Sequence, residues 1–197
     1  MIIVIILYYQ NILNIDKINL SFFVVNFQNN FVLKEKKMKK NIAKAMSEHA
    51  VFEMYSGYIY LQASLVMERE NYKGYAAWLF QHYKEEFSHA EDFIAFLQKR
   101  DITPELGDIK FSPVDVKTPL EVAKLILEHE QKVTARISKL LELARKEGDY
   151  ATEIFLHSYI SEQIEEEDIA KNNLDRFVLA GDNVSARLSV DLTFSGK

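Results

Sequence analysis

The chain has 197 residues, enough for one domain with a sizeable core; 48% of them are hydrophobic and 27% are charged. Its net charge of −5 at pH 7 argues against nucleic acid as a partner, because phosphate binding requires a basic face. The absence of cysteine excludes a disulfide scaffold, thiolate zinc sites and iron–sulfur clusters. Any bound metal must therefore be held by oxygen and nitrogen atoms, and the composition fits a reducing, cytoplasmic setting.

Residues 1–37 differ from the rest of the chain, because they contain no Gly, Ala, Pro or Arg. The opening apolar run is too short to span a bilayer, and it lacks the features of a secretory signal. Its residue types have mostly AT-rich codons, so we interpret residues 1–37 as an atypical extension from a mis-assigned start, with Met38 as the native first residue. The alternative is a genuine extension that docks on a membrane or on cargo. Residues 38–197 form the predicted domain.

From residue 38 onward, glycines and prolines fall between long segments whose apolar residues recur at alternating spacings of three and four. This pattern predicts amphipathic helices. We expect them at about residues 41–70, 75–100, 120–147 and 150–179. Thr118 and Pro119 predict a helix start, with threonine as the N-cap and proline in the first helical position. Gly57 is an exception, because a glycine inside a helix costs about 1 kcal/mol.

The order of these helices predicts an all-α, four-helix bundle. Two short turns make two antiparallel hairpins, whereas the link at 101–119 can run the length of the bundle. Helices two and three are then parallel and joined by a long crossover. A shorter tail at about 182–191 predicts a fifth, C-terminal helix.

On each predicted long helix, the apolar residues form a stripe that faces the interior of the bundle. Each stripe carries a polar or acidic residue near its middle. Desolvating an unpaired carboxylate costs several kcal/mol, and no Lys or Arg lies on these stripes to offset that cost. A bound cation would compensate all the carboxylates at once, so the pattern predicts a metal site. The residues are Glu53, Glu86, Glu130, and Gln163 with Glu166.

The two hairpins repeat one arrangement, which is a glutamate in the first helix and, 33 residues later, a polar pair at i and i+3 in the second. Residues at i and i+3 share a helix face and can hold one ion. A pseudo-twofold axis would join the two sets around a dimetal centre, and only the first contains the Glu-x-x-His of di-iron bundles. The two metal positions should therefore be unequal. The sets are Glu53, Glu86 and His89, and Glu130, Gln163 and Glu166.

Carboxylates with one imidazole suit iron or manganese, and two adjacent Fe(II) ions can give electrons to oxygen together. Tyr60 lies two helical turns after Glu53 on the same stripe, where it can hydrogen-bond a ligand or supply an electron. Glu85, Glu162 and Glu165 alternatively belong to a solvated helix face. We interpret the remaining histidines as structural or surface residues; they are His49, His82, His129 and His157.

At these residues the sequence resembles the bacterial non-haem ferritins, over about residues 38–181. The resemblance implies a ferritin-like bundle that oxidises Fe(II) with oxygen or hydrogen peroxide at a dinuclear ferroxidase site. It also implies storage of Fe(III) mineral in a homo-oligomeric shell of twenty-four subunits, with no membrane or nucleic-acid partner. The shared blocks are Glu53-Met54-Tyr55-Ser56, Glu85-Glu86-Phe87-Ser88-His89, His129-Glu130-Gln131 and Ser161-Glu162-Gln163-Ile164-Glu165-Glu166-Glu167.

The resemblance also implies roles for individual residues. The first iron would be bound by Glu53, Glu86 and His89, with Glu86 bridging. The second iron would be bound by Glu130 and Glu166, with Gln163 beside it, while Tyr60 matches a tyrosine near the first iron. A third iron site would use Glu85, Glu162, Glu165 and Glu166.

Several departures and alternatives qualify this resemblance. The haem-binding bacterioferritins carry a methionine where this chain has Phe87, and a second Glu-x-x-His where it has Glu162 and Glu165, so we expect no haem. One alternative is a shell whose acidic residues only nucleate mineral. A rubrerythrin-like peroxidase is disfavoured by the missing cysteines. A twelve-subunit stress-type ferritin is disfavoured because its ligands lie across a dimer interface.

Overall fold

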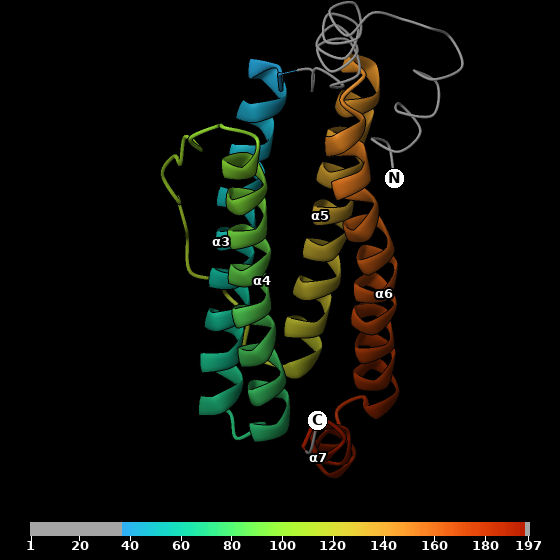
Figure 1. The fold of residues 1–197 in the computed structure, drawn as a ribbon. Helices are drawn as coiled ribbons and strands as arrows, with labels where there is room; N and C mark the ends of the chain where they lie inside the picture. Colours follow the sequence, from blue (N-terminus) through green and yellow to red (C-terminus); the bar gives the residue numbers. More distant parts are fainter. Residues whose placement is uncertain (1–36, 196–197) are drawn as a thin grey trace, which may run out of the picture. The chain divides into compact units, whose positions relative to one another are not determined.

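Four long helices dominate the part of the chain that the structure, a computed structural model, describes, residues 37–195 (Figure 1). No strand occurs in this range. The predicted all-α four-helix bundle with a short C-terminal helix is confirmed, and each predicted boundary lies within two residues of the observed one. The helices are α3 (Lys40–Arg69), α4 (Lys73–Lys99), α5 (Pro119–Glu147), α6 (Tyr150–Ala180) and the short α7 (Val184–Leu192).

The interpretation of residues 1–37 concerns a segment that, apart from Lys37, lies outside the described residues, and it stays a prediction. The residues from 38 onward belong to one compact unit. Within residues 37–195, no helix is both long enough and apolar enough to cross a membrane.

The helices pair as two antiparallel hairpins, α3 with α4 and α5 with α6 (Figure 1). The link at 101–118 contains no helix and returns along the bundle, so that α4 and α5 run parallel as predicted. Helix α5 begins with a full capping box, in which Thr118 Oγ1 accepts from the Glu121 amide at 3.2 Å and Glu121 Oε2 accepts from the Thr118 amide at 3.0 Å. Pro119 occupies the first helical position, also as predicted.

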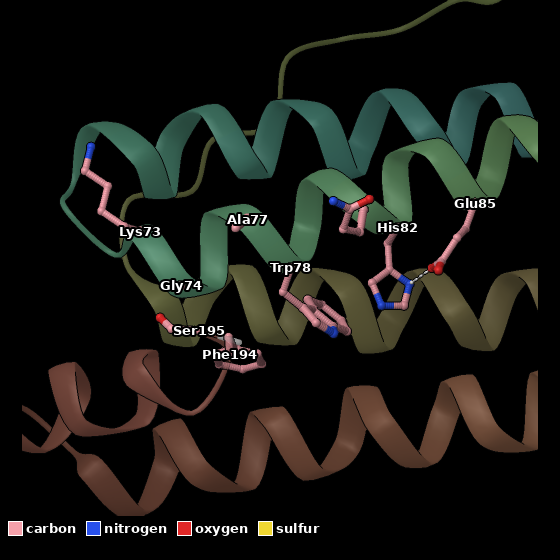
Figure 2. Close-up of a pocket in the computed structure, with 9 residues that line it drawn as sticks. Lys73, Gly74, Ala77, Trp78, His82, Glu85, Phe194 and Ser195 are labelled. Atoms are coloured by element: carbon pink, nitrogen blue, oxygen red, sulfur yellow. Dashed lines mark ion pairs between the residues drawn. The ribbon is translucent and has the colours of Figure 1, made fainter. Parts of the chain in front are cut away.

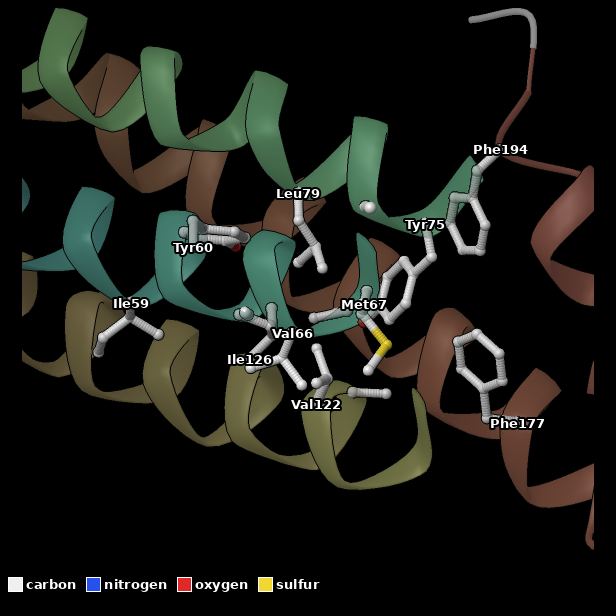
Figure 3. Packing of buried hydrophobic residues seen from close by; sticks show 14 residues of the cluster. Ile59, Tyr60, Val66, Met67, Tyr75, Leu79, Val122, Ile126, Phe177 and Phe194 are labelled. Atoms are coloured by element: carbon white, nitrogen blue, oxygen red, sulfur yellow. The ribbon is translucent and has the colours of Figure 1, made fainter. Parts of the chain in front are cut away.

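Two apolar clusters fill the bundle, one toward each end. The cluster in Figure 3 joins the end of α3, the starts of α4 and α5, and the end of α6. The other joins the opposite ends of the same helices. Gly57 lies on α3 between them, and a Cβ atom there would meet the Phe87 ring at 2.7 Å. The glycine that appeared costly in the sequence therefore lets this ring pack against the α3 backbone.

A buried ion pair joins the two hairpins at one end of the bundle. Arg100 follows α4 and Asp149 precedes α6, and two guanidinium nitrogens lie 3.1 and 3.4 Å from the two carboxylate oxygens. Each side chain is only 8% exposed. Asp149 also accepts a hydrogen bond from the Thr152 amide at 3.1 Å, which caps the start of α6. The Asp149 carboxylate therefore both pairs with the buried Arg100 guanidinium and caps the start of α6.

Hydrogen bonds connect the C-terminal helix α7 to the start of α4. The buried carboxylate of Asp191 accepts hydrogen bonds from the backbone amides of Gly74 and Tyr75, at 3.1 and 2.7 Å. It therefore caps α4 at Gly74, which lies 117 residues earlier in the chain. A Cβ atom on Gly74 would collide with the Asp191 backbone, so the close approach requires glycine. Phe194 then packs on Tyr75, with ring centroids 4.8 Å apart (Figure 3).

Candidate metal centre

A layer of polar side chains crosses the bundle between the two apolar clusters. Each long helix contributes one residue that the sequence singled out. Carboxylate and amide side chains are rarely buried unless they are paired or bind a ligand. They are Glu53 of α3 (1% exposed), Glu86 of α4 (6%), Glu130 of α5 (1%) and Gln163 of α6 (5%).

Glu130 is held by two donors from other helices. The hydroxyl of the fully buried Tyr60 donates to Glu130 Oε1 at 2.7 Å, and Gln163 Nε2 donates to Glu130 Oε2 at 3.2 Å. Burial raises the pKa of Glu130, and these two hydrogen bonds offset only part of the rise. The charged form of this carboxylate is therefore costly in the iron-free protein.

His89 links α4 to α6. Its Nδ1 atom lies 3.7 Å from Glu86 Oε2, and its Nε2 atom lies 3.1 Å from Glu162 Oε1. Burial would lower the pKa of His89, but the hydrogen bonds and charges of Glu162 and Glu86 raise it to about 11. Burial raises the pKa of Glu86 well above its usual range; His89 opposes the rise, and the charges of Glu53 and Glu130 add to it.

Glu53 contacts a histidine that we expected to be structural or on the surface. His49 Nε2 lies 2.7 Å from Glu53 Oε1, and both side chains are almost fully buried. Burial would raise the pKa of Glu53, but the charge and contact of His49, together with the charge of His89 and a hydrogen bond with Glu86, more than compensate, so the pKa is lowered. The signal was present in the sequence, because His49 precedes Glu53 by four residues and shares its helix face.

The remaining predicted residues lie toward the edge of the layer. Glu85 Oε2 lies 3.1 Å and Glu166 Oε2 3.7 Å from Nδ1 of the buried His82. His82 also borders a cavity of about 490 Å³ between α4 and the C-terminal segment (Figure 2). Burial and the charge of His89 lower the pKa of His82 to about 4, so its ring is neutral at pH 7. The side chain of Glu162 is half-exposed, and Glu85, Glu165 and His157 are exposed.

Within residues 37–195, no three His, Asp or Glu side chains converge on a single point. Each buried carboxylate turns instead to its own donor: Glu53 to His49, Glu86 to His89, and Glu130 to Tyr60 and Gln163. The carboxylates nevertheless influence one another: the charges of Glu53 and Glu130 raise the pKa of Glu86, and a hydrogen bond with Glu86 helps to lower the pKa of Glu53. Oxygen donors with one imidazole, drawn from four helices, have the chemistry of an iron or manganese site.

Glu166 makes the stability of the iron-free protein depend on pH. Burial, with the charges of Glu130 and Glu85, raises its pKa from 4.5 to about 7. Between these values the native state binds more protons than the unfolded chain, so stability falls as pH rises through this window, by about 3 kcal/mol in total. We expect the melting temperature of the iron-free protein to rise on acidification from about pH 7.5 to 5, and Glu166→Gln to flatten this rise. The exposed Glu165→Gln is the control, and an unchanged slope in Glu166→Gln would refute the assignment.

The chain is similar to known ferritins in sequence and in structure. Residues 43–180 match the family model described as the ferritin-like domain. A bacterial non-heme ferritin of Bacteroides fragilis (strain 638R) is 34% identical over 145 residues, which cover 74% of this chain and 91% of that protein. One of Staphylococcus aureus (strain USA300) is 30% identical over 149 residues, 76% of this chain and 90% of that protein.

The open pore ferritin of the hyperthermophilic archaeon Archaeoglobus fulgidus has a similar structure. Its crystal structure matches with a TM-score of 0.79 at 31% sequence identity, over 81% of this chain and 99% of that one. The residues that match the family model include the whole polar layer and nearly all of the four long helices. This chain therefore belongs to the ferritin family.

Proposed function

We propose that this protein is a cytoplasmic iron-storage protein with ferroxidase activity. Fe(II) is its substrate. Two Fe(II) ions each lose one electron, and dioxygen takes up both electrons with two protons to give hydrogen peroxide. The Fe(III) product is stored as mineral inside a homo-oligomeric shell, for which we propose twenty-four subunits. Hydrogen peroxide is the alternative oxidant.

The buried carboxylate layer is the observation that carries the proposal. Burial raises the pKa of both Glu86 and Glu130, so their ionised forms are disfavoured in the iron-free bundle. No Lys or Arg among residues 37–195 pairs with them or with Glu53. A divalent cation between the helices would offset this cost, and its carboxylate and imidazole ligands suit iron. Membership of the ferritin family supports the same assignment.

In the proposed site the two iron positions use different ligands. Glu53, Glu86 and His89 hold the first iron, and Glu86 bridges to the second. Glu130 and Glu166 hold the second iron, with Gln163 beside it. Tyr60 remains the hydrogen-bond donor to Glu130, which keeps one oxygen of that carboxylate oriented. A third iron site at the edge of the layer would use Glu85, Glu162, Glu165 and Glu166.

Stopped-flow oxidation of Fe(II) by the iron-free protein tests this proposal. A ferroxidase centre gives a fast phase that saturates at about two Fe(II) ions per chain, because the centre holds two metals. A shell that only nucleates mineral gives a slow reaction without saturation, and that outcome would overturn the proposed activity. Light scattering on the same fraction measures the assembly, and a small particle of few subunits would overturn the proposed shell.

A further inference from the structure

His49 occupies a position that is costly unless its ring has a polar role. The side chain is almost fully buried on α3 and packs against Phe93 and Phe52, with ring centroids 4.6 and 6.3 Å away. Neither of its ring nitrogens, Nδ1 or Nε2, makes a hydrogen bond within residues 37–195. Buried polar atoms are normally satisfied. Glu53 provides a polar contact at short range, with its Oε1 atom 2.7 Å from Nε2.

This short distance requires a proton between the two atoms. Two lone pairs would repel one another at such a separation, so a proton shared between the imidazole and the carboxylate makes the contact attractive. The approach is oblique, so the contact is a close electrostatic one and not an aligned hydrogen bond. Either way, the imidazole attracts one defined oxygen of Glu53 and restricts rotation of the carboxylate.

The second oxygen of Glu53 is supported from another helix. Ser56 Oγ lies 3.4 Å from Glu53 Oε2, and His129 Nε2 of α5 lies 2.7 Å from the same serine oxygen. His129 is itself buried and stacks on Phe52, with ring centroids 5.4 Å apart. Glu53 is thus held at both oxygens, directly by His49 and through Ser56 by His129.

We infer that His49 is a positioning residue for Glu53, which orients the carboxylate for metal binding. The inference rests on the proposed function, in which Glu53 binds the first iron. A ligand that is already oriented loses less rotational freedom when the metal arrives, so its partner strengthens binding without touching the ion. Groups that orient metal ligands in this way typically change metal affinity by about 10–100-fold.

A pair of amide variants separates positioning from packing. Glutamine at position 49 can still extend an N–H group toward Glu53 one helical turn away, whereas asparagine is one methylene shorter and falls short of it. We expect His49→Asn to weaken binding of Co(II), used as a probe for Fe(II), by about 10–100-fold and to shift its visible absorption bands. His49→Gln should bind close to the wild-type level. Calorimetry and absorption spectroscopy on the intact assembly measure both quantities.

Two further variants make the outcome decisive. Leu140→Ala removes buried volume from the apolar cluster that includes Phe93, and should lower the melting temperature while leaving Co(II) binding unchanged. Glu53→Gln should lose the first metal position. If Glu53→Gln weakens binding but His49→Asn and His49→Gln both bind like the wild type, the role of His49 is refuted and the proposed site stands. If Glu53→Gln itself binds like the wild type, the ligand assignment fails first.

Discussion

Replacing Glu86 by glutamine should abolish the fast phase of Fe(II) oxidation and, at the same time, raise the melting temperature of the iron-free protein. Glutamine has nearly the same volume but no negative charge, so the bridging ligand between the two proposed iron positions is lost. We expect the initial rate of oxidation to fall by at least about 100-fold, since even outer partners of metal ligands change affinity by 10–100-fold.

The gain in stability follows from the direction of the pKa shift. Burial raises the pKa of Glu86 well above its usual range, with a further contribution from the charges of Glu53 and Glu130. The stability that this group contributes is complete below pH 4.5 and is lost as pH rises toward the folded-state pKa. Glutamine removes that loss, so the variant should gain about 1–2 kcal/mol near pH 8 and little near pH 4.5.

Stopped-flow absorbance and thermal unfolding of metal-free samples measure the two effects independently. Glu91→Gln is the matched control, because it removes an exposed glutamate from the same helix, α4, and should change neither quantity. A Glu86→Gln variant that retained the fast phase would remove Glu86 from the site. One that melted at a lower temperature at pH 8 would show that the carboxylate stabilises the iron-free bundle.

Asp149→Ala should destabilise the bundle by about 3–5 kcal/mol. The substitution removes the carboxylate opposite the buried Arg100 guanidinium, and it also removes the N-cap of α6, which by itself contributes about 1 kcal/mol. Asp149→Asn keeps an oxygen that can accept from the Thr152 amide but loses the charge, so its cost should be smaller. The difference between the two variants isolates the cap from the ion pair.

Guanidinium-induced unfolding of the iron-free protein measures these costs. The surface pair of Arg187 with Asp182, at 2.6 Å, provides the control, because Asp182 is fully exposed. Asp182→Ala should cost much less than Asp149→Ala, because solvent screens an exposed pair. Equal losses for Asp149→Ala and Asp182→Ala would mean that burial adds nothing to the first pair.

The fold was predictable because its signals are local. Apolar periodicity set the extent of each long helix, and the start of α5 was readable from Thr118 and Pro119. The contact between Asp191 and the start of α4 was not predicted, since no spacing rule relates positions 117 residues apart. It depends on where α7 docks, and only the assembled bundle determines that.

The polar layer was predictable for a different reason. Glu53, Glu86, Glu130 and Gln163 share the phase of the apolar stripes, so their burial followed from helix geometry alone. The polar partner of each carboxylate did not follow from helix geometry. It depends on side-chain rotamers and on the spacing between α3 and α5. His49 was missed as a partner of Glu53 although it lies four residues earlier on the same face, because spacing shows that two residues share a face and not that their side chains contact each other.

The cap that Asp191 supplies has a consequence for biosynthesis. A helix capped by a residue from its own neighbourhood can be completed as soon as that stretch leaves the ribosome. Here, two amides at the start of α4 lack their protein acceptor until Asp191, 117 residues after Gly74, has been translated. In chains that end before Asp191 because of a premature stop codon, the start of α4 would stay frayed. Such chains should be cleaved by proteases before they could join an assembly.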